Sequence, residues 1–193
     1  MSDQSFIQAK ILDSASVKTF MLDHCLSDID KAASLMKSAF HSGKKFLWCG
    51  NGGSAADAQH LSTELLGGLM DHNRQAIPSI ALTTDSSFLT AWANDTDFNS
   101  IFSRQIEALG SAGDILIGIT TSGNSNNIIQ AIHQAQVQNM QTIVLTGASG
   151  GEINGKADVT IQIPSDDTQR IQEGHILVGH ILCELIENSV LGK

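Results

Sequence analysis

Short apolar runs alternate with amphipathic segments along most of the chain. Five runs have the length and composition of buried strands, and they stand at residues 46–49, 79–82, 114–119, 142–145 and 159–163. In the segments between them, apolar residues recur every three or four positions, which is the period of a helix. Strands that alternate with helices indicate right-handed crossovers. We therefore expect an α/β fold with a five-stranded, mostly parallel sheet and helices on both faces.

The first 43 residues are helical in pattern and precede the first strand. They predict two helices with a break near residues 23–28, ending at Ser42-Gly43, where glycine can adopt a left-handed cap. We expect these helices to cover a face or to pack against another subunit. Later helices are predicted near residues 55–65, to Trp92, and over 98–109, 126–138 and 168–190, with an interruption at Asn94-Asp95. No linker or repeat divides the chain, so we expect one domain over 1–193, with 1–43 as leading helices and 44–193 as the core.

Composition narrows the classes of partner. The chain has 193 residues and a formal net charge of −9, from 11 Lys and Arg against 20 Asp and Glu. This balance argues against general binding to nucleic acid or to an acidic membrane surface. The sequence starts without a signal-peptide pattern and has no apolar run near the length of a membrane span. Three separated cysteines, each in apolar sequence, predict free buried thiols. We expect a soluble, cytoplasmic protein.

Three polar loops follow predicted strands, at the edge of a parallel sheet where ligands bind. The first is Asn51-Gly52-Gly53-Ser54 and leads into a helix, the second is Thr120 to Ser125, and the third is Thr146 to Gly151. Glycines allow close backbone approach, and unpaired N–H groups at a helix start attract anions. Each of the first two loops, taken alone, could be an ordinary helix cap. Two such loops at one edge favour a phosphate ligand, and the missing P-loop lysine disfavours nucleotide hydrolysis.

His60 and Glu64 are four residues apart on a predicted helix, so they project from the same face. Such a pair is half of a zinc site, although an exposed glutamate and a core histidine would explain it equally simply. The last helix offers Gln172, His175 and His180 as further ligands, and each histidine could instead be a core residue. On a straight helix Gln172 and His180 are roughly 12 Å apart along the axis, so both reach one ion only with extended side chains or a frayed first turn.

The remaining glutamates of the last helix, Glu173, Glu184 and Glu187, are expected on a solvated face. Arg170 is a possible phosphate or interface partner, or an unpaired surface arginine.

With these residues in view, the sequence resembles sugar-isomerase (SIS) domain proteins, and specifically the phosphoheptose isomerases. The resemblance is carried by CGNGGSAADAQH with the following TELL, LTTDSSFLTAWANDTDFNSIFSRQ, TTSGNS, TGASGG and RIQEGHILVGHILCELIE. It implies a flavodoxin-like, doubly wound fold and the conversion of sedoheptulose 7-phosphate into D-glycero-D-manno-heptose 7-phosphate. That reaction supplies heptose for the lipopolysaccharide core.

The resemblance also implies a set of site residues. The family's zinc positions match His60, Glu64, Gln172 and His180. The expected substrate-binding residues are Asn51, Gly52, Gly53, Ser54, Glu64, Asn94, Asp95, Thr120, Thr121, Ser122, Ser125 and Gln172. The chain departs from the family pattern at two positions. Many relatives have an arginine in place of Gly68, and Thr120 replaces a serine but keeps the hydroxyl.

We expect Glu64 and His180 to act as the acid/base pair, with zinc as a Lewis acid. The resemblance implies a homotetramer with active sites at subunit contacts. Two other functions remain open. Relatives of the same fold include initiator-associating proteins that bind the DnaA replication initiator without catalysis. Others carry out different sugar-phosphate chemistry. The four-residue metal set discriminates, because a pure binding module has no need for it.

Overall fold

The structure is a computed structural model that describes residues 2–192. Its sheet contains β1 (Phe46–Gly50), β2 (Ser79–Ala81), β3 (Ile115–Ile119), β4 (Gln141–Thr146) and β5 (Val159–Gln162). All pairs are parallel and the order is β2-β1-β3-β4-β5. This is the flavodoxin-like doubly wound order, so the predicted fold class is confirmed. Its topological switch point lies between β1 and β3.

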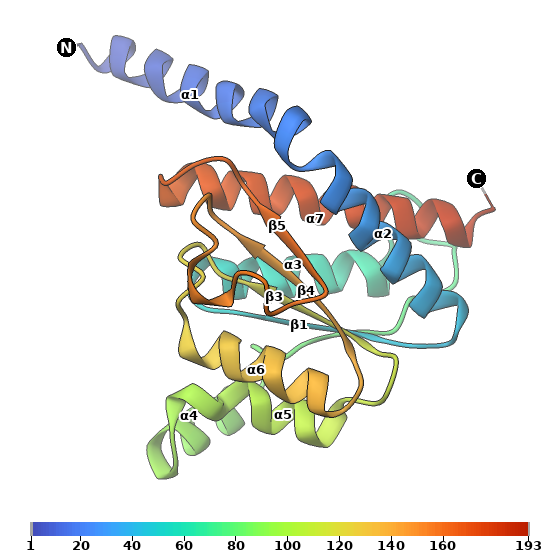
Figure 1. The fold of residues 1–193 in the computed structure, drawn as a ribbon. Helices are drawn as coiled ribbons and strands as arrows, with labels where there is room; N and C mark the ends of the chain where they lie inside the picture. Colours follow the sequence, from blue (N-terminus) through green and yellow to red (C-terminus); the bar gives the residue numbers. More distant parts are fainter. Residues whose placement is uncertain (1, 193) are drawn as a thin grey trace.

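The helices form two layers around the sheet (Figure 1). One layer contains α1 (Asp3–His24), α2 (Leu26–His41), α3 (Gly53–Gly67) and α7 (Thr168–Val190). The other contains α4 (Ser86–Asp95), α5 (Ile101–Leu109) and α6 (Asn126–Val137), with short 3-10 turns at Phe98–Ser100 and Gly151–Ile153.

Alternate residues of each strand face alternate layers. Phe46 and Trp48 of β1 pack with α3 and α7, whereas Leu47 and Cys49 pack with α5 and α6. Both faces of the sheet are therefore buried, which explains why the strand sequences are apolar throughout.

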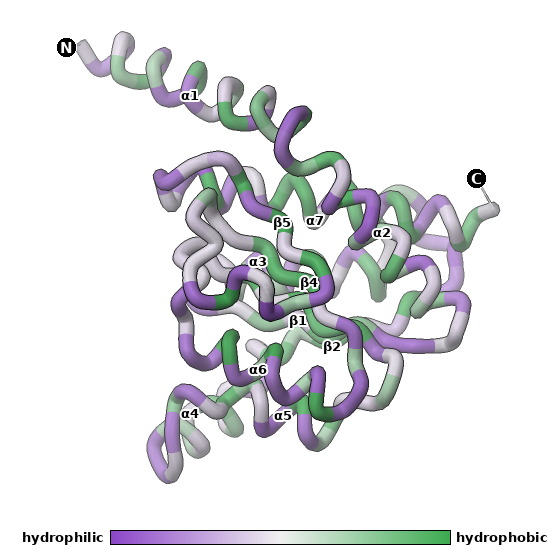
Figure 2. Tube along the Cα trace, in the orientation of Figure 1, coloured by the Kyte–Doolittle hydropathy of each residue, from purple (hydrophilic) through white to green (hydrophobic). Residues whose placement is uncertain are grey.

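The first helix extends beyond the body of the molecule (Figure 1). Apolar positions recur along it (Figure 2). Several of its large apolar side chains are more than half exposed: Phe6, Ile7, Ile11, Leu12, Phe20 and Leu22. The break between the two leading helices is shorter than predicted, because only Cys25 separates α1 from α2.

One predicted interruption is wrong. Asn94 and Asp95 are weak helix formers, but they form the last turn of α4 rather than a break. The helix ends at Asp95, and the amides of the next two residues, Thr96 and Asp97, both donate to the carbonyl of Trp92.

Glu187 also contradicts the sequence interpretation. Its side chain is 1% exposed, not solvated, whereas Glu184 is exposed as expected. The segment after α3 folds back over the end of α7, and the amides of residues 69–71 donate to the Glu187 carboxylate at 2.7–2.8 Å. Arg74 donates to the same carboxylate from Nε at 2.9 Å. Burial raises the pKa of Glu187, but these four hydrogen bonds outweigh it and lower the pKa to about 2.

Arg170 is buried and paired, not an unpaired surface arginine. Its guanidinium donates to Glu173 and contacts Asp13 at 3.4 Å, which ties α1 to the start of α7. The three cysteines are free and buried, as predicted. Among the described residues, no helix is both long and apolar enough to cross a membrane.

The buried carboxylate predicts a specific pH dependence of stability. The pKa of Glu187 is lowered on folding, so its ionisation stabilises the fold fully above the ordinary value of 4.5 and progressively less as the pH falls toward 2. Glu187→Gln cannot ionise. The free energy of unfolding of the wild type minus that of Glu187→Gln should therefore shrink from about pH 5 toward pH 3, measured by urea unfolding. Glu184→Gln is the matched control and should show no such trend. A wild-type/Glu187→Gln difference independent of pH would contradict the assignment.

Candidate active site

The site is built on a close contact between α3 and α7, which run in the same direction side by side (Figure 1). A Cβ at Gly179 of α7 would lie 2.3 Å from Cδ1 of Leu61 in α3. The thiol of Cys183 donates to the carbonyl of Leu61 at 3.7 Å. Glycine at 179 lets the two helices approach. Side chains of α3 and α7 that flank this contact therefore lie close to one another.

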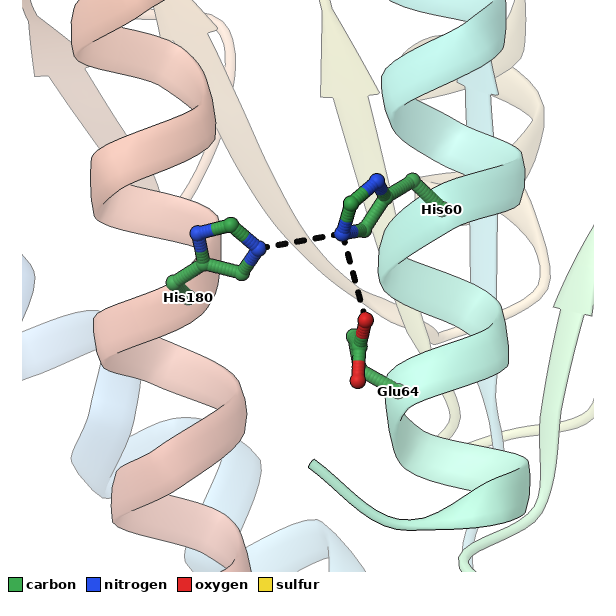
Figure 3. Close-up of side chains that lie close together, drawn as sticks. All are labelled: His60, Glu64 and His180. Carbon is green, nitrogen blue, oxygen red and sulfur yellow. Dashed lines mark hydrogen bonds and ion pairs between the residues drawn. The ribbon is translucent and has the colours of Figure 1, made fainter. Parts of the chain in front are cut away.

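Three of those side chains converge. His60 and Glu64 project from α3, and His180 projects from α7 toward them (Figure 3). The Nε2 atoms of His60 and His180 are 3.0 Å apart, and Nε2 of His60 is 3.2 Å from Oε1 of Glu64. His60 is half exposed, so the group opens to solvent. The structure thus brings together residues that lie 120 positions apart in the sequence.

The group fits a zinc ion. One donor atom from each of the three residues lies within 4.8 Å of the other two. Two ligand atoms about 2.1 Å from a tetrahedral zinc are roughly 3.4 Å apart, which is close to the separations observed here. Two imidazoles and a carboxylate are also a donor set that zinc accepts, and three protein ligands leave a position for substrate.

The other two candidates on α7 have different surroundings. The amide of Gln172 packs against the first residue of α3, since a Cβ at Gly53 would lie 2.5 Å from its Nε2. Gln172 is thus held at the opposite end of the helix contact, and its role as a ligand stays a prediction. His175 is fully buried, and neither of its ring nitrogens has a partner at good hydrogen-bond geometry among residues 2–192, although the backbone of Thr146 lies near enough to favour its charged form. Burial lowers the pKa of His175 to about 4, so it is a neutral core residue.

Asp57 is a neighbour of this group that sequence reasoning missed. It lies one turn before His60 on α3, and partial burial raises the pKa of its carboxyl group. The charges of His60 and His180 act in the opposite direction. The spacing of three residues between Asp57 and His60 was a signal that the sequence offered.

The conformation of the first loop, residues 50–54, requires glycine at two positions. A Cβ at Gly50 would lie 2.4 Å from the carbonyl oxygen of Ser54, and Gly52 has a φ of +55°. Asn51 and Asn127 exchange two side-chain hydrogen bonds, at 2.9 and 2.8 Å. Asn127 is the second residue of α6, the helix after β3, so this amide pair joins the segments on both sides of the switch point. Asn127 was not predicted, because its partner is distant in sequence.

The second and third loops interlock. A Cβ at Gly123 would lie 2.0 Å from the carbonyl oxygen of Gly150, and the amide of Ile153 donates to the carbonyl of Gly123 at 3.0 Å. Within the second loop, Thr120 Oγ1 and Ser125 Oγ are 3.2 Å apart. The hydroxyls predicted for the phosphate are therefore held in one rigid turn, residues 120–125, which we call the hydroxyl turn.

A cavity of about 240 Å³ opens beside this turn. Thr121 and Ser122 line it, as expected for the phosphate loop. Ser149 of the third loop, Ser165 of the segment before α7 and Thr168 at the start of α7 also line it, and sequence reasoning assigned these three hydroxyls no role. Their only signal was their position after β4 and β5 at the ligand edge of the sheet.

Two predicted substrate-binding residues lie apart from this group in the single chain. Asn94 and Asp95 are exposed at the end of α4, and the Asn94 amide donates to Asp95 at 2.7 Å. Among residues 2–192, no hydrogen bond joins them to the other predicted site residues. Their role stays a prediction that depends on a neighbouring subunit.

The departure at Gly68 has a structural reason. Gly68 has a φ of +105°, and a Cβ there would lie 2.5 Å from the carbonyl oxygen of Asp71. This loop conformation therefore requires glycine at the position where the family resemblance led us to expect arginine. Arg74 does not replace that arginine, because its side chain is only 1% exposed and is bound to Glu187.

Comparison with known proteins agrees with this geometry. The family model described as "SIS domain" matches residues 13–147. The phosphoheptose isomerase of Sulfurimonas denitrificans is 46% identical over 191 residues, covering 98% of this chain and 97% of that protein. The phosphoheptose isomerase of Leptospira biflexa is 45% identical over 193 residues, covering 100% and 99%. The chain belongs to the phosphoheptose isomerase family.

Solved structures of the family share the whole fold. Phosphoheptose isomerase GmhA from Neisseria gonorrhoeae superposes with a TM-score of 0.90 at 41% identity, covering 97% of this chain and 100% of that one. A phosphoheptose isomerase from Francisella tularensis gives a TM-score of 0.92 at 38% identity, with the same coverage. Membership makes this chain an enzyme of the aldose–ketose isomerase class and gives it a role in sugar-phosphate metabolism, within heptose biosynthesis.

The interlocked loops predict a local effect of one substitution. Gly123→Ala forces a side chain into the carbonyl of Gly150, so the hydroxyl turn must move. We expect KM for a sugar phosphate to rise by about ten-fold or more, with kcat reduced less. Gly155→Ala is the matched control, since Gly155 also has a positive φ of +73° but a Cβ there meets nothing within 4 Å. Equal effects of the two substitutions in steady-state kinetics would show that backbone strain, not the loop contact, is responsible.

Proposed function

We propose that this enzyme converts D-sedoheptulose 7-phosphate into D-glycero-D-manno-heptose 7-phosphate at the group formed by His60, Glu64 and His180. The convergence of these three side chains on one open space carries the proposal. A binding module for a replication initiator has no need of such a group. The names of the relatives support the substrate, and the hydroxyl turn at the same sheet edge supplies donors for its phosphate.

Two pairs of proton transfers account for the reaction. In the first half, the Glu64 carboxylate takes a proton from C1 of the ketose, and the Nδ1–H group of His180, whose Nε2 faces His60, donates its proton to the carbonyl oxygen on C2. The product is a 1,2-enediol. In the second half, Glu64 returns its proton to C2, and His180 takes the proton of the hydroxyl on C1, which becomes the aldehyde. Both residues regain their starting states, and the sugar phosphate keeps its composition.

Zinc is the proposed cofactor, held by His60, Glu64 and His180, with Gln172 as the further ligand that the family resemblance implies. When bound, the ion supplies Lewis-acid polarisation of the carbonyl and hydroxyl oxygens. Glu64 has two carboxylate oxygens, and only Oε1 faces His60. One oxygen can therefore serve coordination while the other remains available to the proton on carbon.

The phosphate end of the substrate is held away from the reacting carbons. Thr120, Ser122 and Ser125 provide uncharged hydroxyl donors for a dianion, and the amides of Gly123 and Asn124 orient two of these hydroxyls by donating to Thr120 Oγ1 and Ser122 Oγ. A seven-carbon chain places its phosphate far from C1, which matches a site divided between the hydroxyl turn and the α3–α7 contact. We propose that the product enters the pathway to the lipopolysaccharide core. The cytoplasm, where free thiols persist, is the proposed location.

Substitution of the two proton-transfer residues tests the mechanism. Glu64→Gln and His180→Gln should each lower kcat for sedoheptulose 7-phosphate by about 10² to 10⁴-fold, because each removes one proton-transfer group. Unfolding midpoints should stay close to that of the wild type, and Glu184→Gln on α7 should retain full activity. Near-normal turnover by both variants would refute the assignment. Initiator binding without turnover by the wild type would favour the non-enzymatic alternative.

We further propose that the protein forms a homotetramer through α1, whose exposed apolar side chains need a covering surface.

Leu12→Glu places a charge at a 61% exposed apolar position, and we expect the dissociation constant of the assembly to rise by at least about ten-fold. Gln8→Glu adds the same charge to an exposed polar position of the same helix and should leave the assembly intact. Sedimentation velocity distinguishes the species. An unchanged mass for Leu12→Glu would contradict a role for this face.

A further inference from the structure

We propose that Arg74 is a positioning residue that ties the backbone of Glu64 to Glu187 of α7 and so fixes the spacing between Glu64 and His180. The inference rests on the proposed function, because it concerns residues assigned there to zinc and proton transfer. Arg74 itself does not reach the open site, since its side chain is only 1% exposed.

Arg74 makes three contacts in three directions. Its Nε donates to Oε2 of Glu187 at 2.9 Å, and its Nη1 donates to the carbonyl of Gln75 at 2.8 Å. Its Nη2 donates to the carbonyl of Glu64 at 2.7 Å. Only a planar guanidinium can serve a carboxylate and a backbone carbonyl at once in this way, and a lysine ammonium cannot reproduce the fork.

The carbonyl of Glu64 belongs to a residue that the proposed mechanism uses for proton transfer. It lies in the last turn of α3, which ends at Gly67, and it accepts from the amide of Gly68 at 3.1 Å as well as from Arg74. The backbone at Glu64 determines where its carboxylate points. A contact on this carbonyl therefore acts directly on the residue that the proposed chemistry depends on.

The other end of the connection is fixed to α7. Glu187 lies seven residues, or about two helical turns, beyond His180 on the same helix. Its carboxylate also holds the amides of residues 69–71, so the whole segment after α3 is attached to α7. The helix contact is then fixed at Gly53 with Gln172, at Leu61 with Gly179, and at Glu64 with Glu187 through Arg74.

A purely structural ion pair is the simpler explanation, and the contact to Glu64 distinguishes the two. Loss of one partner from a buried pair destabilises a protein whatever the pair does for function. Arg74→Lys separates the effects, because lysine keeps the positive charge beside Glu187 but loses the simultaneous contact with the Glu64 carbonyl.

The test compares Arg74→Lys, Glu187→Gln, the wild type and the control Glu184→Gln. Zinc affinity is measured on metal-free protein by competition with a chelator, together with unfolding midpoints and steady-state kinetics. For Arg74→Lys we expect a cooperative unfolding transition, zinc binding weaker by about ten-fold, a lower kcat and an unchanged KM. In Glu187→Gln, hydrogen exchange of the segment 68–78 should also accelerate. Glu184→Gln should match the wild type throughout.

Wild-type zinc affinity and kcat in Arg74→Lys would overturn the inference. Loss of cooperative unfolding in Arg74→Lys would also overturn it, because the pair would then be needed for the fold itself. A wild-type protein that neither binds zinc nor turns over sedoheptulose 7-phosphate would instead refute the proposed function, and the inference with it. The two failures are distinguishable, because the second appears in the unsubstituted protein.

Discussion

The close packing of α3 against α7 is the constraint on which the site depends. In a doubly wound sheet, the helices after β1 and β5 cover the same face and run in the same direction. The absence of a side chain at Gly179 lets Leu61 fill the space between them. His60 and Glu64 on one side, and His180 on the other, then face one another at hydrogen-bond distance. A larger residue at 179 would separate them, so a packing requirement and a chemical one meet at the same glycine.

The proposed phosphate region depends on a second set of contacts, between loops rather than helices. The Asn51–Asn127 amide pair bridges the switch point, and Gly123 lies directly against Gly150. These contacts order the hydroxyl turn before any ligand arrives, which reduces the entropy lost on binding. In the proposed mechanism, an anion-binding edge is thus combined with an acid/base group held between two helices. This division suits a long substrate with its phosphate at one end and its reacting carbons at the other.

Much of this arrangement was predictable from local patterns. The five strands and α7 follow from apolar periodicity, and the facing of His60 and Glu64 follows from helical spacing alone. The approach of His180 required the family resemblance, because spacing cannot show which helix packs on which. Glu187 was misassigned for the same reason, since only the folded segment 69–71 reveals why a carboxylate is buried there. Asn94 and Asp95 were predicted to break a helix from intrinsic propensity, and helix α4 includes them nevertheless.

The central claim is that His60, Glu64 and His180 form a single metal-dependent centre. Anomalous diffraction at the zinc edge, from crystals of the zinc-loaded protein, tests this claim most directly. The account predicts one strong peak about 2.0–2.2 Å from Nε2 of His60, Nε2 of His180 and a carboxylate oxygen of Glu64. A zinc peak elsewhere on the molecule, with these three side chains uncoordinated, would contradict it.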